Sequence, residues 1–345
     1  MRKTGMTIAA SMASVLIAMT VSLAVSAQVK ILFNSFEPPG GAIFPGAIKP
    51  WIAEVERVTE GRVKIEVPPT SLAPPPQQYE LVKQGVADGA YTLNVWLQKQ
   101  WLLPQIGHLA FAGGTSKATA VALWRTHKRF FETANEYNDV ELLGYCAGPA
   151  SFLFTLGDKP ITSAEDIKGK KMFAPANMAK PFQALGAAVV VGPVVRIHDQ
   201  VSKGIVDMAA GLSYHPADGF NAMPYLKSAT EIPGGLFAPT FSIILSKAKW
   251  AQISKDDQAK IMEVSGEKLA RSCEYWDTLE KASMDKFLKS GKTRVAAPPE
   301  LIAALKKAFA PDEEAWLADA KKRGVDGVAA LAYYRQQIEA VMAEK

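Results

Sequence analysis

The chain has 345 residues, of which 48% are hydrophobic, 9% aromatic and 21% charged. These proportions are typical of a globular protein, and they exclude a collagen, a coiled-coil rod, a disordered tail protein and a small disulfide scaffold. The 39 basic and 34 acidic residues are interleaved, so the net charge of +5 forms no basic stripe and we expect no nucleic-acid partner. Because one hydrophobic core usually takes about 100–200 residues, the length predicts two domains.

The N-terminal segment, residues 1–27, is predicted to be a secretory signal peptide. Two basic residues precede an uncharged apolar run over Met6–Val25, and the small residues Ser26 and Ala27 offer a cleavage site. The alternative is a retained membrane anchor, because the run approaches the about 20 residues that span a bilayer. With cleavage favoured, the mature chain begins at Gln28 in an oxidising compartment, the bacterial periplasm.

Strands and helices alternate at the start of the mature chain. Val29–Phe33 is expected to be a strand, and apolar residues at helical spacing over Ile48–Val58 predict a helix. Val63–Val67 alternates apolar and polar residues, as a half-buried strand does, and Gln77–Gln84 follows as a helix after a proline-rich loop. This order predicts an open α/β sheet.

A short pattern occurs twice along the chain. Lys83–Asp88 resembles Ser202–Asp207: in each, a helix is expected to end at a glycine and a short apolar strand to follow. The two copies suggest two similar α/β halves, each with its own sheet, although a chance similarity of short patterns is the alternative.

Beyond Pro239 the chain is predicted to be mostly helical. Ser254 is a good N-cap, and no proline interrupts the apolar stripe as far as Lys289, so we expect one helix of roughly 30 residues that could span both halves. Shorter helices are expected over Pro299–Phe309, Pro311–Lys322 and Gly327–Met342.

Motifs of catalysis and metal binding are missing from the sequence. It holds no GxSxG, HExxH, P-loop or GxGxxG pattern, and Ser213 with His215 lacks a placed acid for a triad. Two cysteines exclude a thiolate-rich metal site. Cys273 lies on the apolar stripe and is interpreted as an ordinary buried thiol, with a bridge to Cys146 as the alternative. We therefore expect no enzyme, no metal and no cofactor.

Several segments resemble the solute receptors of TRAP (tripartite ATP-independent periplasmic) transporters, the dicarboxylate-receptor-like family. They are, in order, Val58–Ile65, Lys159–Pro175, Leu185–Ala187, Lys203–Asp207 and Ser246–Trp250. The resemblance covers nearly the whole mature chain, and the order and spacing of the segments are more specific than any one of them. Receptors of this family often carry C4-dicarboxylates, sialic acid or other organic acids.

The resemblance implies an α/β fold of two domains that close on a ligand like a clam shell, with a long helix bracing both. The domains expected are residues 28–148 plus 238–275, and 149–237 plus 276–345. Small ligands of such folds bind between the domains, near the carboxyl ends of strands. The resemblance also implies a monomeric periplasmic receptor that delivers its solute to the small and large membrane subunits of a TRAP permease. The alternatives are a receptor that serves a sensor or another carrier, and a periplasmic enzyme on a similar scaffold.

The chain departs from the family where most members bind the ligand carboxylate. Phe173 stands where the pattern Gly-x-Lys-x-Arg-x-Pro has its arginine, and Phe152 is the counterpart of a second arginine. Each charge-assisted hydrogen bond lost removes about 1.5–3 kcal/mol of carboxylate binding. Three interpretations follow. The ligand is an aromatic or apolar organic acid, or it is a neutral or cationic solute that binds to aromatic faces. Alternatively, the site has lost its function in part and binds its ligand weakly.

Other wall residues follow from the same resemblance, and each stands just after a strand or near a crossing between the domains. They are Asn34, Phe36, Glu37, Asn94, Trp96, Asn177, Tyr214, His215, Phe237 and Thr240. Glu37 distinguishes an organic acid from a cationic solute as the ligand, because an unpaired carboxylate facing the ligand would favour a cation.

Overall fold

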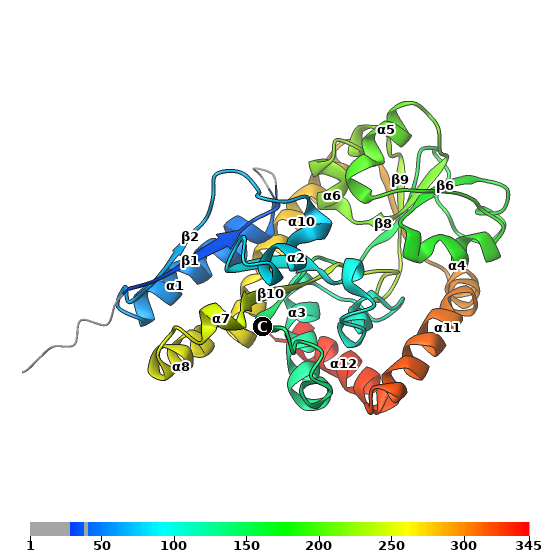
Figure 1. Ribbon diagram of the computed structural model, residues 1–345. Coiled ribbons are helices and arrows are strands. Elements are labelled where there is room, and N and C mark those ends of the chain that lie inside the picture. The colour runs from blue at the N-terminus through cyan, green and yellow to red at the C-terminus, as the bar shows by residue number, and fades with distance from the viewer. Residues whose placement is uncertain (1–27, 38–40, 345) are drawn as a thin grey trace, which may run out of the picture.

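The computed structural model describes residues 28–37 and 41–344 and shows two α/β lobes (Figure 1). The predicted signal peptide, residues 1–27, lies outside the described residues. Within the described part of the chain, every helix is too short or too polar to cross a membrane.

The first lobe is built on a five-stranded sheet with the order β2-β1-β3-β10-β4. Its strands are β1 (Val29–Asn34), β2 (Val63–Glu66), β3 (Gly89–Leu93), β4 (Val140–Ala147) and β10 (Thr240–Ser246). β1 is parallel to β2 and β3, whereas β10 is antiparallel to β3 and β4. The helices of this lobe are α1 (Lys49–Val58), α2 (Gln78–Lys83), α3 (Ser116–Thr126), α7 (Lys247–Trp250), α8 (Lys255–Val264) and α9 (Gly266–Ser272).

The second lobe is built on a six-stranded sheet with the order β11-β9-β5-β8-β6-β7. Its strands are β5 (Phe152–Thr155), β6 (Lys171–Ala174), β7 (Ala188–Val191), β8 (Met208–Leu212), β9 (Ser228–Glu231) and β11 (Thr293–Ala296). Its short helices are α4 (Ala179–Ala184), α5 (Ile197–Ser202) and α6 (Tyr214–Gly219). Successive residues of β5 and β6 face two separate hydrophobic clusters, one on each side of the sheet.

The repeated pattern in the sequence corresponds to equivalent elements of the two lobes. Gly85 follows α2 and Gly204 follows α5, with backbone φ angles of +71° and +61°, and β3 and β8 come next. Glycine adopts this left-handed conformation without the steric cost that other residues meet. The expected pair of α/β halves, each with its own sheet, is thereby confirmed.

The prediction of one unbroken helix over Ser254–Lys289 is wrong. The segment forms α8, α9 and α10 (Glu274–Lys289), with breaks at Ser265 and Cys273. Gly266, the first residue of α9, has φ +54°, and a Cβ atom placed there would lie 2.6 Å from the Trp124 ring, so the packing of this tryptophan requires glycine beside the first break. The apolar stripe continues across both breaks, which is why periodicity does not reveal them.

The C-terminal part of the chain connects the lobes again. α11 (Pro299–Lys322) begins in the core of the second lobe and ends in that of the first, and α12 (Gly327–Met342) packs in the first lobe. This differs from the expectation that residues 276–345 belong to the second domain. Pro311 lies inside α11, so the two predicted helices are one. A cavity of about 550 Å³ lies beside this proline, lined by Phe111, Phe309 and Arg335 among others.

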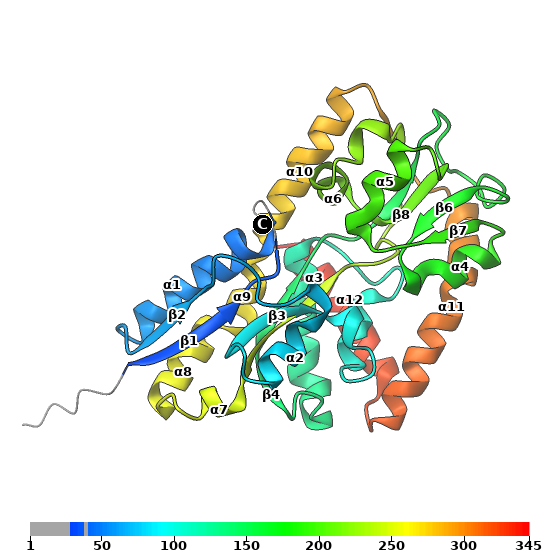
Figure 2. The same cartoon turned by 45° about the horizontal axis from the view of Figure 1, so that its top comes forward.

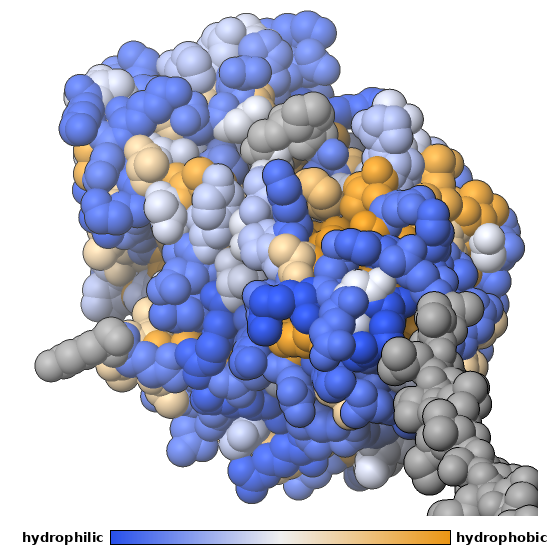
Figure 3. All heavy atoms as spheres, turned by 90° about the vertical axis from the view of Figure 1, so that its left-hand side faces the viewer, coloured by the Kyte–Doolittle hydropathy of each residue, from blue (hydrophilic) through white to orange (hydrophobic). Residues whose placement is uncertain are grey.

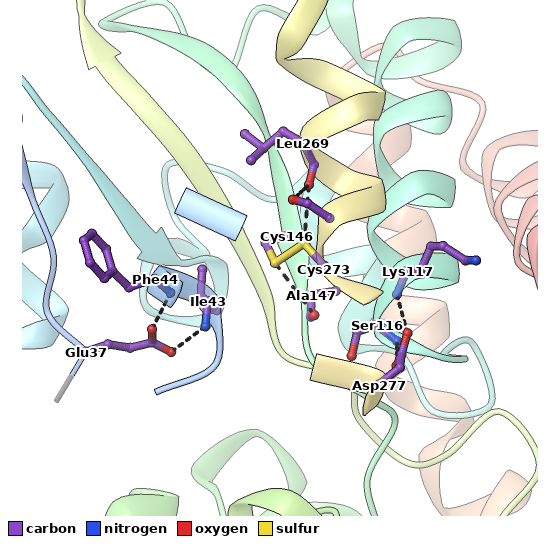
Figure 4. The surroundings of a disulfide bond; sticks show 11 residues. Glu37, Ile43, Phe44, Ser116, Lys117, Cys146, Ala147, Leu269, Cys273 and Asp277 are labelled. Atoms are coloured by element: carbon purple, nitrogen blue, oxygen red, sulfur yellow. Dashed lines mark hydrogen bonds between the residues drawn. A yellow bond between two sulfur atoms is a disulfide. The ribbon is translucent and has the colours of Figure 1, made fainter. Parts of the chain in front are cut away.

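Cys146 and Cys273 form a disulfide, so the interpretation of Cys273 as an ordinary buried thiol is wrong. The bond joins the end of β4 to the residue that precedes α10 (Figure 4). Sequence spacing could not show this, because the two cysteines are 127 residues apart. The start of α10 is therefore covalently fixed to the first lobe.

Two carboxylates of α10 accept hydrogen bonds from the two lobes, one carboxylate from each lobe. Asp277 accepts hydrogen bonds from the backbone N–H groups of Ser116 and Lys117 at the start of α3, at 2.6 and 3.0 Å (Figure 4). One turn later, Glu280 accepts from the N–H groups of Tyr214 and His215 at the start of α6, both at 2.8 Å. Figure 2 shows α10 running from the first lobe along α6. We name this pair of contacts, Asp277 on α3 and Glu280 on α6, the double cap.

Replacing both cysteines by serine is expected to lower the free energy of unfolding by about 5 kcal/mol, because a bridge across 127 residues restricts the unfolded chain strongly. Chemical denaturation with and without dithiothreitol measures this. The reductant should destabilise the wild type and leave the double variant unchanged. A variant as stable as the oxidised wild type would contradict the prediction.

Glu280→Gln is expected to change how stability depends on pH. Burial raises the pKa of Glu280 from 4.5 to about 7, against the opposing hydrogen bonds from His215, Tyr214 and Ser213. Between these values the folded state binds a proton that the unfolded state lacks, so this group's contribution to stability falls as pH rises from about 4.5 to 7. The difference in free energy of unfolding, wild type minus variant, should fall by about 3 kcal/mol over that window. Urea titrations at several pH values would show a constant difference if the pKa of Glu280 were ordinary.

Candidate functional site

The strand ends of the two sheets lie close to each other where the chain first crosses between the lobes. β4 ends at Ala147 and β5 begins at Phe152. The four residues between them span at most about 17 Å when extended. β10 starts beside the end of β4, and β5 starts beside the end of β8, so this crossing joins the edges at which β3 and β8 finish.

A row of aromatic side chains connects these two edges. Trp96 meets Phe36 at a centroid distance of 5.7 Å, and Phe36 meets Phe241 at 6.5 Å. Phe241 lies 6.2 Å from Trp276 of α10, which lies 6.3 Å from the ring of His215 in the second lobe. We call these five residues the aromatic row. Its rings offer flat apolar faces, and Trp96 is 37% exposed.

The second lobe adds two more aromatic residues next to the row. The half-buried ring of Phe152 lies 5.7 Å from that of Tyr214. The Tyr214 hydroxyl donates to Glu231 at 3.0 Å, which fixes the ring. Burial also raises the pKa of Tyr214, so this hydroxyl stays protonated. Phe152 is thus supported from behind and keeps part of its surface free.

Asn34 and Asn94 hold loops of the first lobe in place. Asn34 donates from Nδ2 to Gln78 at 2.6 Å and accepts at Oδ1 from the N–H of Leu72 at 2.9 Å. Asn94 donates to Thr240 at 3.0 Å and accepts from Ser242 at 2.6 Å. Both side chains are completely buried, so their amides are already used within the protein.

Glu37 is a paired carboxylate in this structure. It accepts hydrogen bonds from the N–H groups of Ile43 and Phe44, at 3.1 and 2.7 Å, where a π-helical turn begins (Figure 4). Burial raises its pKa, and these hydrogen bonds oppose that shift. The unpaired carboxylate that would favour a cationic ligand is therefore not what the structure shows at this position.

Phe173 lies in the core of the second lobe. Its side chain is 1% exposed and joins the cluster that α5, α6 and α10 cover, because its neighbours Met172 and Ala174 face the opposite side of the sheet. Phe173 is paired with Ala209 in β8, whereas Phe152 is paired with Leu212 at the end of that strand. The contact of Phe173 with a ligand stays a prediction. Arginine at this position would place an unpaired charge in that core.

The remaining predicted residues lie around the same edges. Phe237 is buried against His108, at a centroid distance of 4.9 Å, and His108 in turn contacts Thr240. Burial lowers the pKa of His108 to about 3, so it is neutral at physiological pH. Asn177 is half-buried beyond the end of β6. The sequence reasoning missed Trp276, because its position on a predicted helix gave no sign that it lies between the lobes.

The carboxylates nearest the aromatic row, Glu37, Asp277 and Glu280, each accept hydrogen bonds from backbone N–H groups. The aromatic row and Phe152 include no lysine or arginine, and Arg196, which follows β7, is exposed and has no ion-pair partner among the described residues. The face of the molecule seen in Figure 3 is mostly hydrophilic, with apolar side chains gathered in a patch to the right of its centre. The flat rings of the aromatic row, with no basic side chain among them, suit a solute with a flat apolar body.

Sequence comparison places most of the chain in one family. Residues 33–319 match the profile of the bacterial extracellular solute-binding proteins of family 7. A curated relative, the outer membrane transporter protein TsaT of Comamonas testosteroni, is 35% identical over 311 residues, which are 90% of this chain and 92% of that protein.

Solved structures share the two-lobed architecture. A TRAP periplasmic solute-binding protein of Bordetella bronchiseptica, with bound (R)-mandelate and (S)-mandelate, has a TM-score of 0.81 and 28% identity, covering 91% of this chain and 99% of that one. A marine metagenome TRAP solute-binding protein specific for aromatic acid ligands, in complex with metahydroxyphenylacetate, has a TM-score of 0.77 and 26% identity, covering 91% and 99%. A TRAP solute-binding protein of Rhodoferax ferrireducens with copurified benzoate has a TM-score of 0.76 and 26% identity, covering 91% and 98%. The clam-shell fold expected from the sequence is confirmed.

Proposed function

The chain belongs to family 7 of the bacterial extracellular solute-binding proteins, the TRAP solute receptors, and we propose that it binds an aromatic carboxylic acid between its two lobes. The observation that carries this proposal is the aromatic row, which connects the facing sheet edges through Trp276. A ligand ring stacked on such faces gains about 0.5–1.5 kcal/mol per contact beyond its buried area.

The ligands of three similar receptors support the proposal that the solute carries a carboxylate. The structures at 26–28% identity hold mandelate, metahydroxyphenylacetate and benzoate, each an aromatic ring with a carboxylate attached directly or through one carbon. The pairing of Glu37 with backbone N–H groups speaks against a cation. Dicarboxylates fit poorly, because a second carboxylate buried among apolar rings without a cation costs several kcal/mol.

We assign two kinds of role to the predicted site residues. Those with free surface form the wall that meets the ligand, and those that are buried hold the wall in place. The wall residues are Phe152, Trp96, His215 and Asn177. The supporting residues are the buried Phe173, Tyr214, Asn34, Asn94 and Phe237, together with Glu37, which is half-buried but already paired with backbone N–H groups.

The proposal includes the route of the solute. The precursor is exported and cleaved after Ala27, and the mature receptor works as a monomer in the periplasm. The buried disulfide suits that oxidising compartment. The loaded receptor then delivers the acid to the small and large membrane subunits of a TRAP permease and carries out no chemistry of its own.

Aromatic acids should stabilise the mature protein and dicarboxylates should not. Benzoate, mandelate and 3-hydroxyphenylacetate are expected to raise its melting temperature, whereas succinate and malate leave it unchanged, and calorimetry should confirm the binding. Phe152→Ala tests the wall: it should weaken the aromatic acid about tenfold or more, since the ring contact and its apolar area are lost. Tight succinate binding by the wild type would contradict the proposal.

Ligand binding is also expected to close the lobes. Small-angle scattering should report a smaller radius of gyration with saturating ligand than without it, because the connections at the strand edges allow a hinge motion. An unchanged radius with a ligand that calorimetry shows to be bound would mean that the receptor does not close.

A further inference from the structure

Two buried hydrogen-bond donors near the first crossing have no partner among the described residues: the indole Nε1–H of Trp276 and the hydroxyl of Ser151. Buried polar groups are normally paired, so an unpaired donor calls for an explanation. Among the described residues, Thr92, Ser116 and Tyr334 also carry unpaired buried hydroxyls, but those residues belong to the first lobe.

Trp276 lies between the lobes, on the central part of the aromatic row. Its ring packs between Phe241 of the first lobe and His215 of the second. A Cβ atom at Gly148 would lie 2.9 Å from Cη2 and 3.1 Å from Cζ2 of this ring, so the indole covers the start of the first crossing. Gly148 itself donates to the carbonyl of Pro239, which joins the two crossing strands there.

Ser151 ends the same crossing. Its backbone is fixed on both sides, since its N–H donates to Phe237 at 2.7 Å and its carbonyl accepts from Leu236 at 3.1 Å. The side chain is 1% exposed. The next residue is Phe152, the wall residue that replaces an arginine of the family pattern. Ser151 therefore ends the four-residue segment whose start, at Gly148, is covered by the Trp276 indole from α10, at the meeting point of the sheet edges.

We propose that Trp276 Nε1–H and the Ser151 hydroxyl donate hydrogen bonds to the carboxylate of the bound aromatic acid. This rests on the proposed function and names the groups that recognise the acid. Hydrogen bonds to an ionised acceptor are stronger than neutral ones, and more so in a site that excludes water. Two neutral donors thus supply the recognition that arginine supplies elsewhere, and the aromatic row holds the ring beside them.

Trp276→Phe keeps an aromatic ring and removes the donor. The dissociation constant for benzoate, measured by calorimetry, should rise about tenfold to a hundredfold, while that for benzamide changes less than about threefold. Ser151→Ala should show the same selectivity for the acid. The indole N–H has no partner in the absence of ligand. Removing this donor in Trp276→Phe should therefore not by itself lower the melting temperature of the free protein. Tyr334→Phe, which deletes an unpaired hydroxyl within the first lobe, is the matched control and should leave both constants unchanged.

Three outcomes would overturn the assignment. Equal losses for benzoate and benzamide would show a purely structural role, and unchanged benzoate binding would show no role. Loss of benzoate binding in Arg196→Gln, with Trp276→Phe unaffected, would assign the carboxylate to that exposed arginine instead. The wild-type titration separates the proposed function from this inference. If benzoate and the other aromatic acids do not bind to the wild type, the proposed function fails as well. If the wild type binds them and the Trp276 and Ser151 variants bind them equally well, only the assignment of these two donors fails.

Discussion

The arrangement of the two lobes depends on the double cap that α10 supplies. Asp277 and Glu280 lie one turn apart on the same face of the helix, and each satisfies the free N–H groups at the start of a helix from a different lobe. A cap of this kind contributes about 1 kcal/mol and fixes direction as well as distance. Since the disulfide anchors the helix just before Asp277, the strand edges and the aromatic row meet in a defined geometry.

The same helix explains why the site is apolar. Its buried carboxylates are occupied by backbone donors, and the side chain that α10 presents to the row is Trp276. The buried amides of Asn34 and Asn94 are likewise occupied within the first lobe. Polar groups that look available in the sequence are thus used for hydrogen bonds within the protein, and aromatic side chains predominate where the two sheet edges meet.

Some of this could be predicted from the sequence, and some could not, for physical reasons. Alternating strands and helices, and the glycines after α2 and α5, are local signals that predicted both lobes. The glycine beside the first break packs against Trp124, far away in the sequence, and the disulfide joins residues 127 apart, so neither feature is a local signal. Phe173 lies on the strand face that α5 covers, a choice between two faces that the sequence pattern alone does not make, and its contact with a ligand stays a prediction. A sequence pattern also does not tell which lobe an amphipathic helix such as α12 will cover.

α11 sets a mechanical limit on the receptor. About 36 Å long, it is anchored by Leu301 and Leu305 in the second lobe and by Trp316 in the first, on the other side of the second lobe from α10 (Figures 1 and 2). An α-helix hardly stretches, so it acts as a strut, and the lobes can swing apart only as far as it bends. Pro311 has no N–H to donate and is the weak point of the strut. How far the lobes separate therefore depends on how much this helix bends, and Pro311 is where it bends most easily.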